Sequence, residues 1–207
     1  MQVLNYHERE VPAAASVVGA LVDTLASDND CLWPKGWPAM RFDRPLGVGA
    51  VGGHGPIPYT VEEYRPGQMV KFRFLGPRGF DGHHWFEVLP RGEHCTILRH
   101  TIRMRAHGPA LLSWPIAIRP LHDALLEDAL ALAQASAGAT PIVQPWSLWV
   151  KVLRWLMSRG RPWAEAAAGP GRTLSPQVRH LASDQLKGVL RYHNKFIHAD
   201  PGGDAIA

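Results

Sequence analysis

The fold is decided by the stretch HHWFEVLPRGEHCTILRHTIRMR, which spans residues 83–105. Two runs within it, 83–89 and 94–105, alternate between apolar and polar residues, as strands with one buried face do. The four residues between them, Pro, Arg, Gly and Glu, suit the turn of a hairpin. The stretch therefore predicts two antiparallel strands of one sheet.

The polar residues of this hairpin indicate which of its faces meets solvent. In the second run the three arginines all fall on one face. The opposite face places His100 between Leu98 and Ile102. The same alternation puts His84 and Phe86 on that side of the first run. We therefore predict that this second face is buried, with two histidines among apolar residues.

Further segments have the pattern of strands, namely residues 2–11, 46–54, 58–65 and 69–75. Both faces of the first carry polar residues, which favours a position at the edge of the sheet. The second is rich in glycine, which lets a sheet bend sharply. In the last, Val70, Phe72 and Phe74 share one face, which we expect to be buried.

Helices are predicted on both sides of these strands. Pro12 suits the first turn of a helix whose apolar stripe reaches Leu25, with an end at residues 28–30. A long helix follows from Pro120 to Gly138, and Pro115 predicts a kink or break just before it. Between them, two Trp-Pro pairs exclude a regular helix over residues 31–45 and predict an ordered aromatic loop.

The last third of the chain differs in composition. Residues 1–140 hold 13 Lys and Arg against 14 Asp and Glu, whereas residues 141–207 hold 9 against 4. A short helix is predicted over 146–158, a linker over 160–172, and a final helix from Ser175 to about Ile197. We therefore divide the chain into a near-neutral domain, 1–140, and a basic, Trp-rich helical extension, 141–207.

The order of these elements predicts an α+β fold. An opening strand and helix, several antiparallel strands and a long helix fit a curved antiparallel sheet wrapped around that last helix. Such a sheet closes over its helix incompletely. An apolar cavity between the sheet and the long helix is the expected result.

Residues 64–67, 70–74, 84–88, 96–102 and 119–128, together with the opening strand before a Pro-led helix, carry a resemblance to a known superfamily. Through them, residues 1–140 resemble the START-like proteins, also called Bet v 1-like, SRPBCC or polyketide cyclase/dehydrase proteins, whose fold is the helix-grip fold. The resemblance is to the actinobacterial type of member with no defined activity. It lies in the order and pattern of elements and covers residues 1–140, so residues 141–207 depart from it.

The resemblance implies that the cavity binds lipids, sterols, polyketides or other apolar molecules. It implies no universal catalytic residue. The primary functional prediction is therefore the binding of a hydrophobic small molecule or lipid between the sheet and the long helix. Fold resemblance does not by itself give a function.

The ligand-binding residues are predicted from the buried faces of the strands and from the aromatic loop. In that loop, Trp33, Trp37 and Met40 fit either a lid over the cavity or a plug at one end of the core. The predicted set is Trp33, Trp37, Met40, Phe72, Phe74, His84, Phe86, Leu98, His100 and Ile102.

An enzyme is the first alternative. His84 and His100 would act as acid and base in the cyclisation, dehydration or hydrolysis of a polyketide-like or steroid-like substrate, with Tyr59 or Glu63 assisting. Both histidines also fit the pattern of hydrogen-bonded core residues. No cofactor is predicted. No metal site is predicted either, because nothing in the sequence indicates that a third ligand, such as His54, lies close to His84 and His100.

The helix predicted over 146–158 is a second candidate for function. Lys151 and Arg154 share one face of it, and apolar residues fill the rest, which is typical of a helix at a membrane surface or against a partner protein. The pattern also fits docking on the protein's own core or on a second copy in a homodimer. The residues predicted to form this surface are Trp146, Trp149, Lys151, Arg154 and Trp155. Nucleic acid is not predicted as a partner, because the sequence has no nucleic-acid-binding motif.

Several bulk features bear on the compartment. Two cysteines, Cys31 and Cys95, do not make a disulfide framework, and the first ten residues lack the pattern of a secretory signal. No segment reaches the roughly 20 apolar residues of a spanning helix. These features predict a cytoplasmic protein, with peripheral membrane contact through 146–158 as the alternative.

Overall fold

The computed structural model describes residues 1–158, so the predicted linker over 160–172 and the predicted helix from Ser175 lie outside the described residues. Within them, one antiparallel sheet has the strand order β1-β7-β6-β5-β4-β3-β2. The strands are β1 (Gln2–Val11), β2 (Met40–Phe42), β3 (Val51–His54), β4 (Ile57–Arg65), β5 (Met69–Phe74), β6 (Phe80–Pro90) and β7 (Thr96–Ala106).

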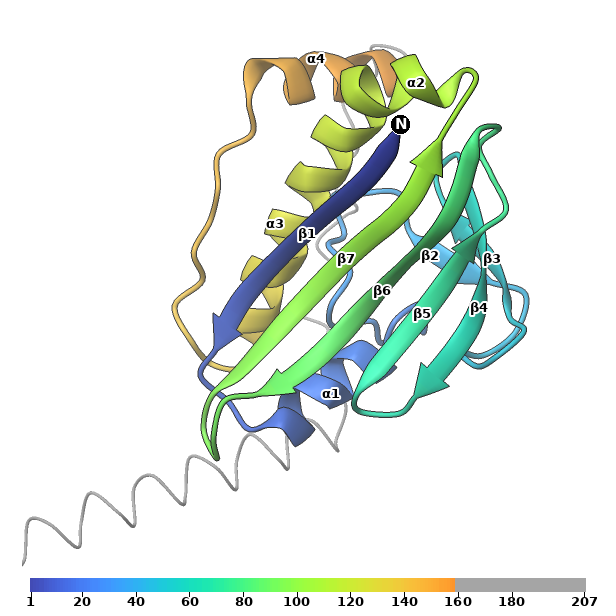
Figure 1. Cartoon of the computed structure of the whole chain (residues 1–207). Coiled ribbons are helices and arrows are strands. Elements are labelled where there is room, and N and C mark those ends of the chain that lie inside the picture. Colours follow the sequence, from blue (N-terminus) through green and yellow to red (C-terminus); the bar gives the residue numbers. More distant parts are fainter. Residues whose placement is uncertain (159–207) are drawn as a thin grey trace, which may run out of the picture.

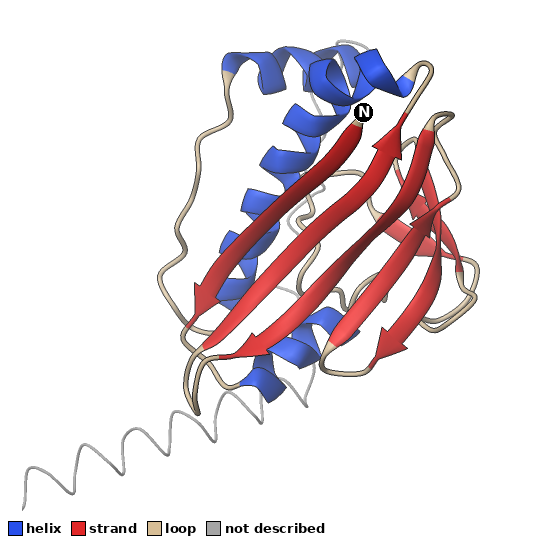
Figure 2. Cartoon of the chain, viewed as in Figure 1, coloured by secondary structure: helices blue, strands red, loops and turns tan. Residues whose placement is uncertain are grey.

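The predicted hairpin is confirmed as β6 and β7, which pair along almost their whole length. Its register sets His84 opposite Ile102 and Phe86 opposite His100. β1 pairs with the other side of β7 and forms one edge of the sheet, as its polar pattern predicts. Figure 2 shows the sheet curving away from β1 toward β2 and β3, which gives it a concave face.

The helices of the described part are α1 (Ala15–Asp23), α2 (Ala110–Ser113), the π-helix η1 (Trp114–Ile118), α3 (Arg119–Ser136) and α4 (Leu148–Met157). The long helix α3 runs across one face of the sheet behind β1 and β7, and α1 covers the same face near the opposite end (Figure 1). The predicted α+β architecture, a curved antiparallel sheet around a long helix, is therefore confirmed.

The assignment of the buried face is also confirmed. His100 and His84 are 2% and 4% exposed, and Phe72, Phe86 and Leu98 are almost completely buried. Together with apolar residues of α1 and α3 they form one hydrophobic core. Because successive side chains of a strand point to opposite faces, the period of two in the sequence was enough to place them.

Two segments differ from the sequence prediction. The predicted strand over 46–54 begins only at Val51, because the chain turns at Gly49, which has a φ of 82°. Gly52 then lets β2 approach closely, since a Cβ there would stand 1.9 Å from the carbonyl oxygen of Arg41. The first helix begins at Ala15, so Pro12 lies before it rather than in its first turn. It ends at Asp23 rather than near residue 28, and the Thr24 hydroxyl donates back to the Leu21 carbonyl.

The kink or break expected at Pro115 takes the form of η1. Proline has no backbone N–H and cannot make the usual helical hydrogen bond, so a wider π-helical turn replaces an α-helical one between α2 and α3. This turn directs Ala117 and Ile118 toward the core side of the long helix. Gly138, with a φ of 81°, follows the end of α3 as predicted.

The aromatic loop over 31–45 is ordered by side-chain hydrogen bonds. Asp30 Oδ1 accepts from the backbone N–H groups of Leu32 and Trp33, at 3.0 and 2.8 Å. The Trp33 indole donates to the Pro38 carbonyl at 2.8 Å, and the Trp37 indole donates to Asp128 Oδ2 at 2.7 Å. The loop is therefore fastened to α3, and both indoles are held at one end of the core.

Candidate functional site

A cavity of about 230 Å³ lies between the concave face of the sheet, η1, α3 and the aromatic loop. Most of the predicted ligand-binding residues line it, namely Trp33, Trp37, Met40, Phe74, His84, Phe86, His100 and Ile102. Phe72 and Leu98 do not line it, although both are fully buried beside it. Phe72 packs instead against the rings of Tyr59 and His84.

The helices contribute a part of the cavity wall whose residues were not predicted from the sequence. Trp114 and Ile118 come from η1, and Leu125 and His122 come from α3. His122 stands three residues before Leu125 in the apolar spacing of that helix, so the period of 3.6 carried a signal for its inward position. His54, at the end of β3, also lines the cavity.

Four histidines, His54, His84, His100 and His122, therefore stand in the wall of one apolar cavity. Burial lowers the pKa of each of them, to about 3 for His54. All four are consequently neutral at physiological pH. Of the described residues that line the cavity, none is Lys, Arg, Asp or Glu.

Two of these histidines are paired. His84 Nδ1 and His100 Nε2 stand 3.2 Å apart and share a hydrogen bond. His84 is stacked between the rings of Phe72 and Phe74, and Phe86 meets the edge of His100. The remaining nitrogens, His84 Nε2 and His100 Nδ1, have no hydrogen-bond partner among the described residues.

The other two candidate catalytic residues do not line the cavity. Tyr59 is fully buried behind it, with its hydroxyl 2.9 Å from His54 Nδ1. Glu63 forms an ion pair with Arg65 and is partly exposed. The irregular pairing of β4 with β5 between Val61 and Glu63 shifts the alternation of this strand, which the sequence did not reveal. The placement of Tyr59 and Glu63 in the cavity is corrected accordingly.

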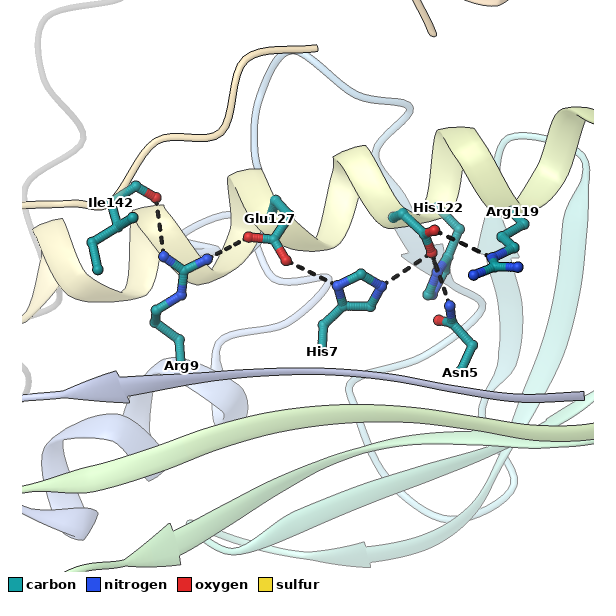
Figure 3. A network of polar contacts seen from close by, with 8 residues as sticks. Asn5, His7, Arg9, Arg119, His122, Glu127 and Ile142 are labelled. Atoms are coloured by element: carbon teal, nitrogen blue, oxygen red, sulfur yellow. Dashed lines mark hydrogen bonds and ion pairs between the residues drawn. The ribbon is translucent and has the colours of Figure 1, made fainter. Parts of the chain in front are cut away.

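A second cluster joins the edge strand to the long helix, and we call it the β1–α3 network: Asn5, His7, Arg9, Asp123 and Glu127 (Figure 3). Asn5 Nδ2 and His7 Nε2 both lie 3.0 Å from Asp123 Oδ1. His7 Nδ1 lies 2.9 Å from Glu127 Oε1, and Arg9 forms an ion pair with the same carboxylate.

The β1–α3 network sets the protonation of His7. Burial alone would lower the pKa of His7, but hydrogen bonds and attraction from Asp123 and Glu127 outweigh burial and raise it. Both ring nitrogens face carboxylate oxygens, so both carry hydrogen when the two acids are ionised. Burial alone would raise the pKa of Asp123, but the nearby rings of His122 and His7 outweigh burial and lower it.

The helix α4 presents part of the predicted surface and buries the rest. Arg154 is 9% exposed, because its guanidinium lies 4.2 and 4.1 Å from the ring centroids of Trp37 and Trp146. Its Nη2 donates to the Gly36 carbonyl at 2.7 Å. The placement of Arg154 on an exposed basic face is therefore corrected.

The opposite side of α4 is open to solvent and apolar. Trp155 is 60% exposed, Trp149 is 46% exposed, and Lys151 is exposed beside them. The Trp149 indole donates to the Ile116 carbonyl at 2.7 Å, so this face of α4 adjoins η1. Within the described part of the chain, no helix combines the length and apolar character that crossing a bilayer requires.

Comparisons with known proteins identify the fold. No protein-family model matches the chain, and no curated protein matches it in sequence. Norcoclaurine synthase from Thalictrum flavum, solved in complex with dopamine and hydroxybenzaldehyde, is 15% identical over 69% of this chain and 90% of that chain, with a TM-score of 0.51. A truncated structure of the same synthase is 16% identical over 65% of this chain and 93% of that chain, with a TM-score of 0.50.

A START superfamily protein from Mycobacterium smegmatis is matched as well, at 15% identity over 65% of this chain and 96% of that chain, with a TM-score of 0.44. Similarity at this level of identity concerns the fold and not the activity. The chain has a START/Bet v 1-like helix-grip fold, as the sequence resemblance implies.

The neutral cavity histidines predict a loss of stability in acid. The unfolded chain protonates His84 as the pH falls through about 6.5, whereas burial keeps the folded chain from doing so until a much lower pH. The stability that depends on neutral His84 is therefore complete above about pH 6.5. As the pH falls below that value, the free energy of unfolding decreases by about 1.4 kcal/mol per pH unit for each proton that only the unfolded chain binds.

We expect His84→Gln to reduce the slope of the free energy of unfolding against pH by about 1.4 kcal/mol per pH unit, which is the effect of one proton. Urea denaturation at a series of values between about pH 4.5 and pH 6.5 measures it. His94→Gln is the matched control, because the His94 side chain is 74% exposed. Equal slopes for His84→Gln and the unmodified protein would show that His84 is protonated in the folded state.

Proposed function

We propose that the protein binds an uncharged, largely apolar small molecule in the cavity between the sheet and α3. The observation that carries the proposal is the cavity itself, about 230 Å³ of volume inside the core and bounded by aromatic and aliphatic side chains. Protein cores are normally packed without voids much larger than a water molecule. The volume lies just below the roughly 300–1,000 Å³ of sites for drug-sized ligands, so it suits a smaller molecule, and its apolar lining is that of a ligand site.

The chemistry of the wall restricts the charge of the ligand. Its described lining residues include no ionised side chain, and the histidines are neutral. Burial of an ionised ligand group there would cost several kcal/mol without compensation. An anionic fatty acid or a cationic amine is therefore disfavoured against a neutral molecule of similar size.

The histidine pair adds one polar feature to this recognition. In a neutral pair that shares one hydrogen bond, the two remaining nitrogens are always one donor and one acceptor, whichever tautomer is present. A ligand hydroxyl, which both donates and accepts, would match the nitrogens left over on His84 and His100. Buried nitrogens without a partner cost about 1–3 kcal/mol each, so a ligand that reached them would gain affinity.

Binding is favoured over catalysis by the same geometry. An acid–base mechanism needs several polar groups that converge on one open volume. Tyr59 and Glu63 do not line the cavity, and His84 and His100 spend one nitrogen each on their mutual bond. The alternative of a cyclase, dehydratase or hydrolase would rest on histidines alone, the pair together with His54 and His122.

Two fluorescent probes of nearly the same shape test the proposal. Phenylnaphthylamine is uncharged, and anilinonaphthalenesulfonate carries an added sulfonate. We expect the neutral probe to bind at one site and at least about tenfold more tightly, because the sulfonate would have to be buried without a counter-charge. Fluorescence titration measures both affinities.

A variant that fills the cavity locates the site. Ala117→Phe adds a ring to the cavity wall and should weaken binding of the neutral probe by about tenfold or more, while Ala135→Phe, at an exposed position of the same helical region, should not. Equal binding by both variants, or stronger binding of the sulfonate, would contradict the proposal.

We also propose that the exposed face of α4 rests on a membrane surface when the ligand enters or leaves. Leu148, Trp155 and Leu156 are each more than half exposed, and Met157 of the same helix reaches the cavity wall. An apolar helix face of this kind with a lysine beside it suits the boundary between headgroups and acyl chains. An apolar ligand would then pass between the lipid and the cavity without crossing water.

Vesicle flotation tests this second proposal. We expect Trp155→Ser together with Leu156→Ser to reduce the bound fraction on vesicles that contain anionic lipid, because both side chains are more than half exposed and would enter the lipid. Lys151→Gln should weaken binding to anionic vesicles by about 1 kcal/mol and leave neutral vesicles unaffected. A double variant that floats as well as the unmodified protein would refute membrane contact through α4.

A further inference from the structure

Three side chains of the kinds that bind transition metals meet where β1 passes the first turns of α3. They are His7, His122 and Asp123, and one ligand atom from each lies within 4.8 Å of the others. His7 and Asp123 belong to the β1–α3 network, and His122 also lines the cavity. More than a hundred residues separate the strand from the helix in sequence, so no short sequence motif indicates this cluster.

The spacing of the ligand atoms is close to what a small metal ion requires. His7 Nε2 lies 3.0 Å from Asp123 Oδ1, and His122 Nδ1 lies 3.5 Å from the same oxygen. Ligands of a tetrahedral zinc ion, bound at about 2.0–2.1 Å, stand about 3.3 Å apart. These two contacts are within a few tenths of an ångström of that spacing, and the two histidine nitrogens, which lie within 4.8 Å of each other, would have to close to the same spacing around the ion.

The second observation is that His122 is buried without a hydrogen bond. Its side chain is 10% exposed, and neither ring nitrogen has a hydrogen-bond partner in the described part of the chain. Buried side-chain nitrogens are normally hydrogen-bonded, whereas the nearest polar contact of this ring among the described residues is the 3.5 Å approach of Nδ1 to Asp123 Oδ1, so both nitrogens are available to a ligand. Here the imidazole stands next to a carboxylate and a second imidazole (Figure 3).

The surroundings of His7 supply the usual support for a metal-binding imidazole. His7 Nδ1 bonds to Glu127 at 2.9 Å, which leaves Nε2 toward Asp123. A carboxylate on the far nitrogen fixes the orientation of a ligating histidine and raises its basicity. Arg9 pairs with Glu127 in turn, and Arg119 approaches the other oxygen of Asp123, so Oδ1 is not taken by either guanidinium. Asn5 Nδ2 donates to Oδ1 at 3.0 Å and would orient this oxygen, which has a second lone pair for the ion.

We propose that His7 Nε2, His122 and Asp123 Oδ1 form a binding site for a divalent transition-metal ion such as Zn²⁺. Binding releases the proton from His7 Nε2 and leaves the Nδ1–H bond to Glu127 in place. Two imidazoles and one carboxylate are a donor set that zinc accepts, and three protein ligands leave one position for water or a further ligand atom. Because His122 lines the cavity, the ion would stand in the wall between the β1–α3 network and the cavity.

Zinc titration of the full, tag-free chain after chelation tests the site. We expect one Zn²⁺ per chain by isothermal titration and elemental analysis, and a rise in melting temperature with added zinc. His122→Asn should weaken zinc binding by at least about 100-fold, because loss of a direct ligand exceeds the effect of a supporting residue. The His122 side chain makes no hydrogen bond, so this variant removes a ligand without breaking the β1–α3 network.

The controls distinguish this site from others on the chain. Asp123→Asn is the second ligand variant and should lose zinc as well, whereas His94→Gln, at an exposed histidine, should keep it. Co²⁺ in place of zinc should show the absorption of nitrogen and oxygen ligands without a thiolate band. The site is overturned if no stoichiometric zinc binds, if both ligand variants bind as tightly as the unmodified protein, or if the cobalt spectrum shows a cysteine ligand.

Discussion

The attachment of α3 to the edge strand is the interaction on which the rest of the structure depends. Along β1 the inward side chains Asn5, His7 and Arg9 are polar, and they meet Asp123 and Glu127 of the helix. Removal of one member of a fully buried ion pair costs about 3–5 kcal/mol, and the members of this network are partly exposed, so each removal costs less than that. The β1–α3 network therefore fixes where the long helix crosses the sheet. With the helix held at that edge, the curved sheet has room for a cavity on the other side.

Two histidines on adjacent strands have pKa values shifted in opposite directions. His7 and His100 are direct neighbours across β1 and β7. Two carboxylates raise the pKa of His7, whereas burial lowers the pKa of His100. The boundary between a charged network and an uncharged cavity thus runs between adjacent strands. His122 stands on this boundary, since it lines the cavity and lies beside Asp123.

The features that could be predicted from the sequence are those whose pattern lies within a single strand or helix. Strict alternation in β6 and β7 placed His84 and His100 on the buried face, because a period of two needs no knowledge of the partner strand. The irregular pairing near Glu63 broke that alternation in β4, and no residue there signals it. The pairing of His7 with Asp123 depends on tertiary contact. Arg154 looked exposed by helical spacing, but the indole of Trp37 from the aromatic loop and that of Trp146 just before α4 cover it.

The central claim is that the space between the sheet and α3 is an open apolar site rather than part of a solid core. A crystal structure of the full chain under xenon pressure tests it most directly, because xenon enters dry apolar cavities and is unmistakable in electron density. The account predicts a xenon peak among His84, Phe86 and Leu125, or an apolar molecule already bound there. Side chains that fill this space, with no xenon and no bound molecule, would contradict it.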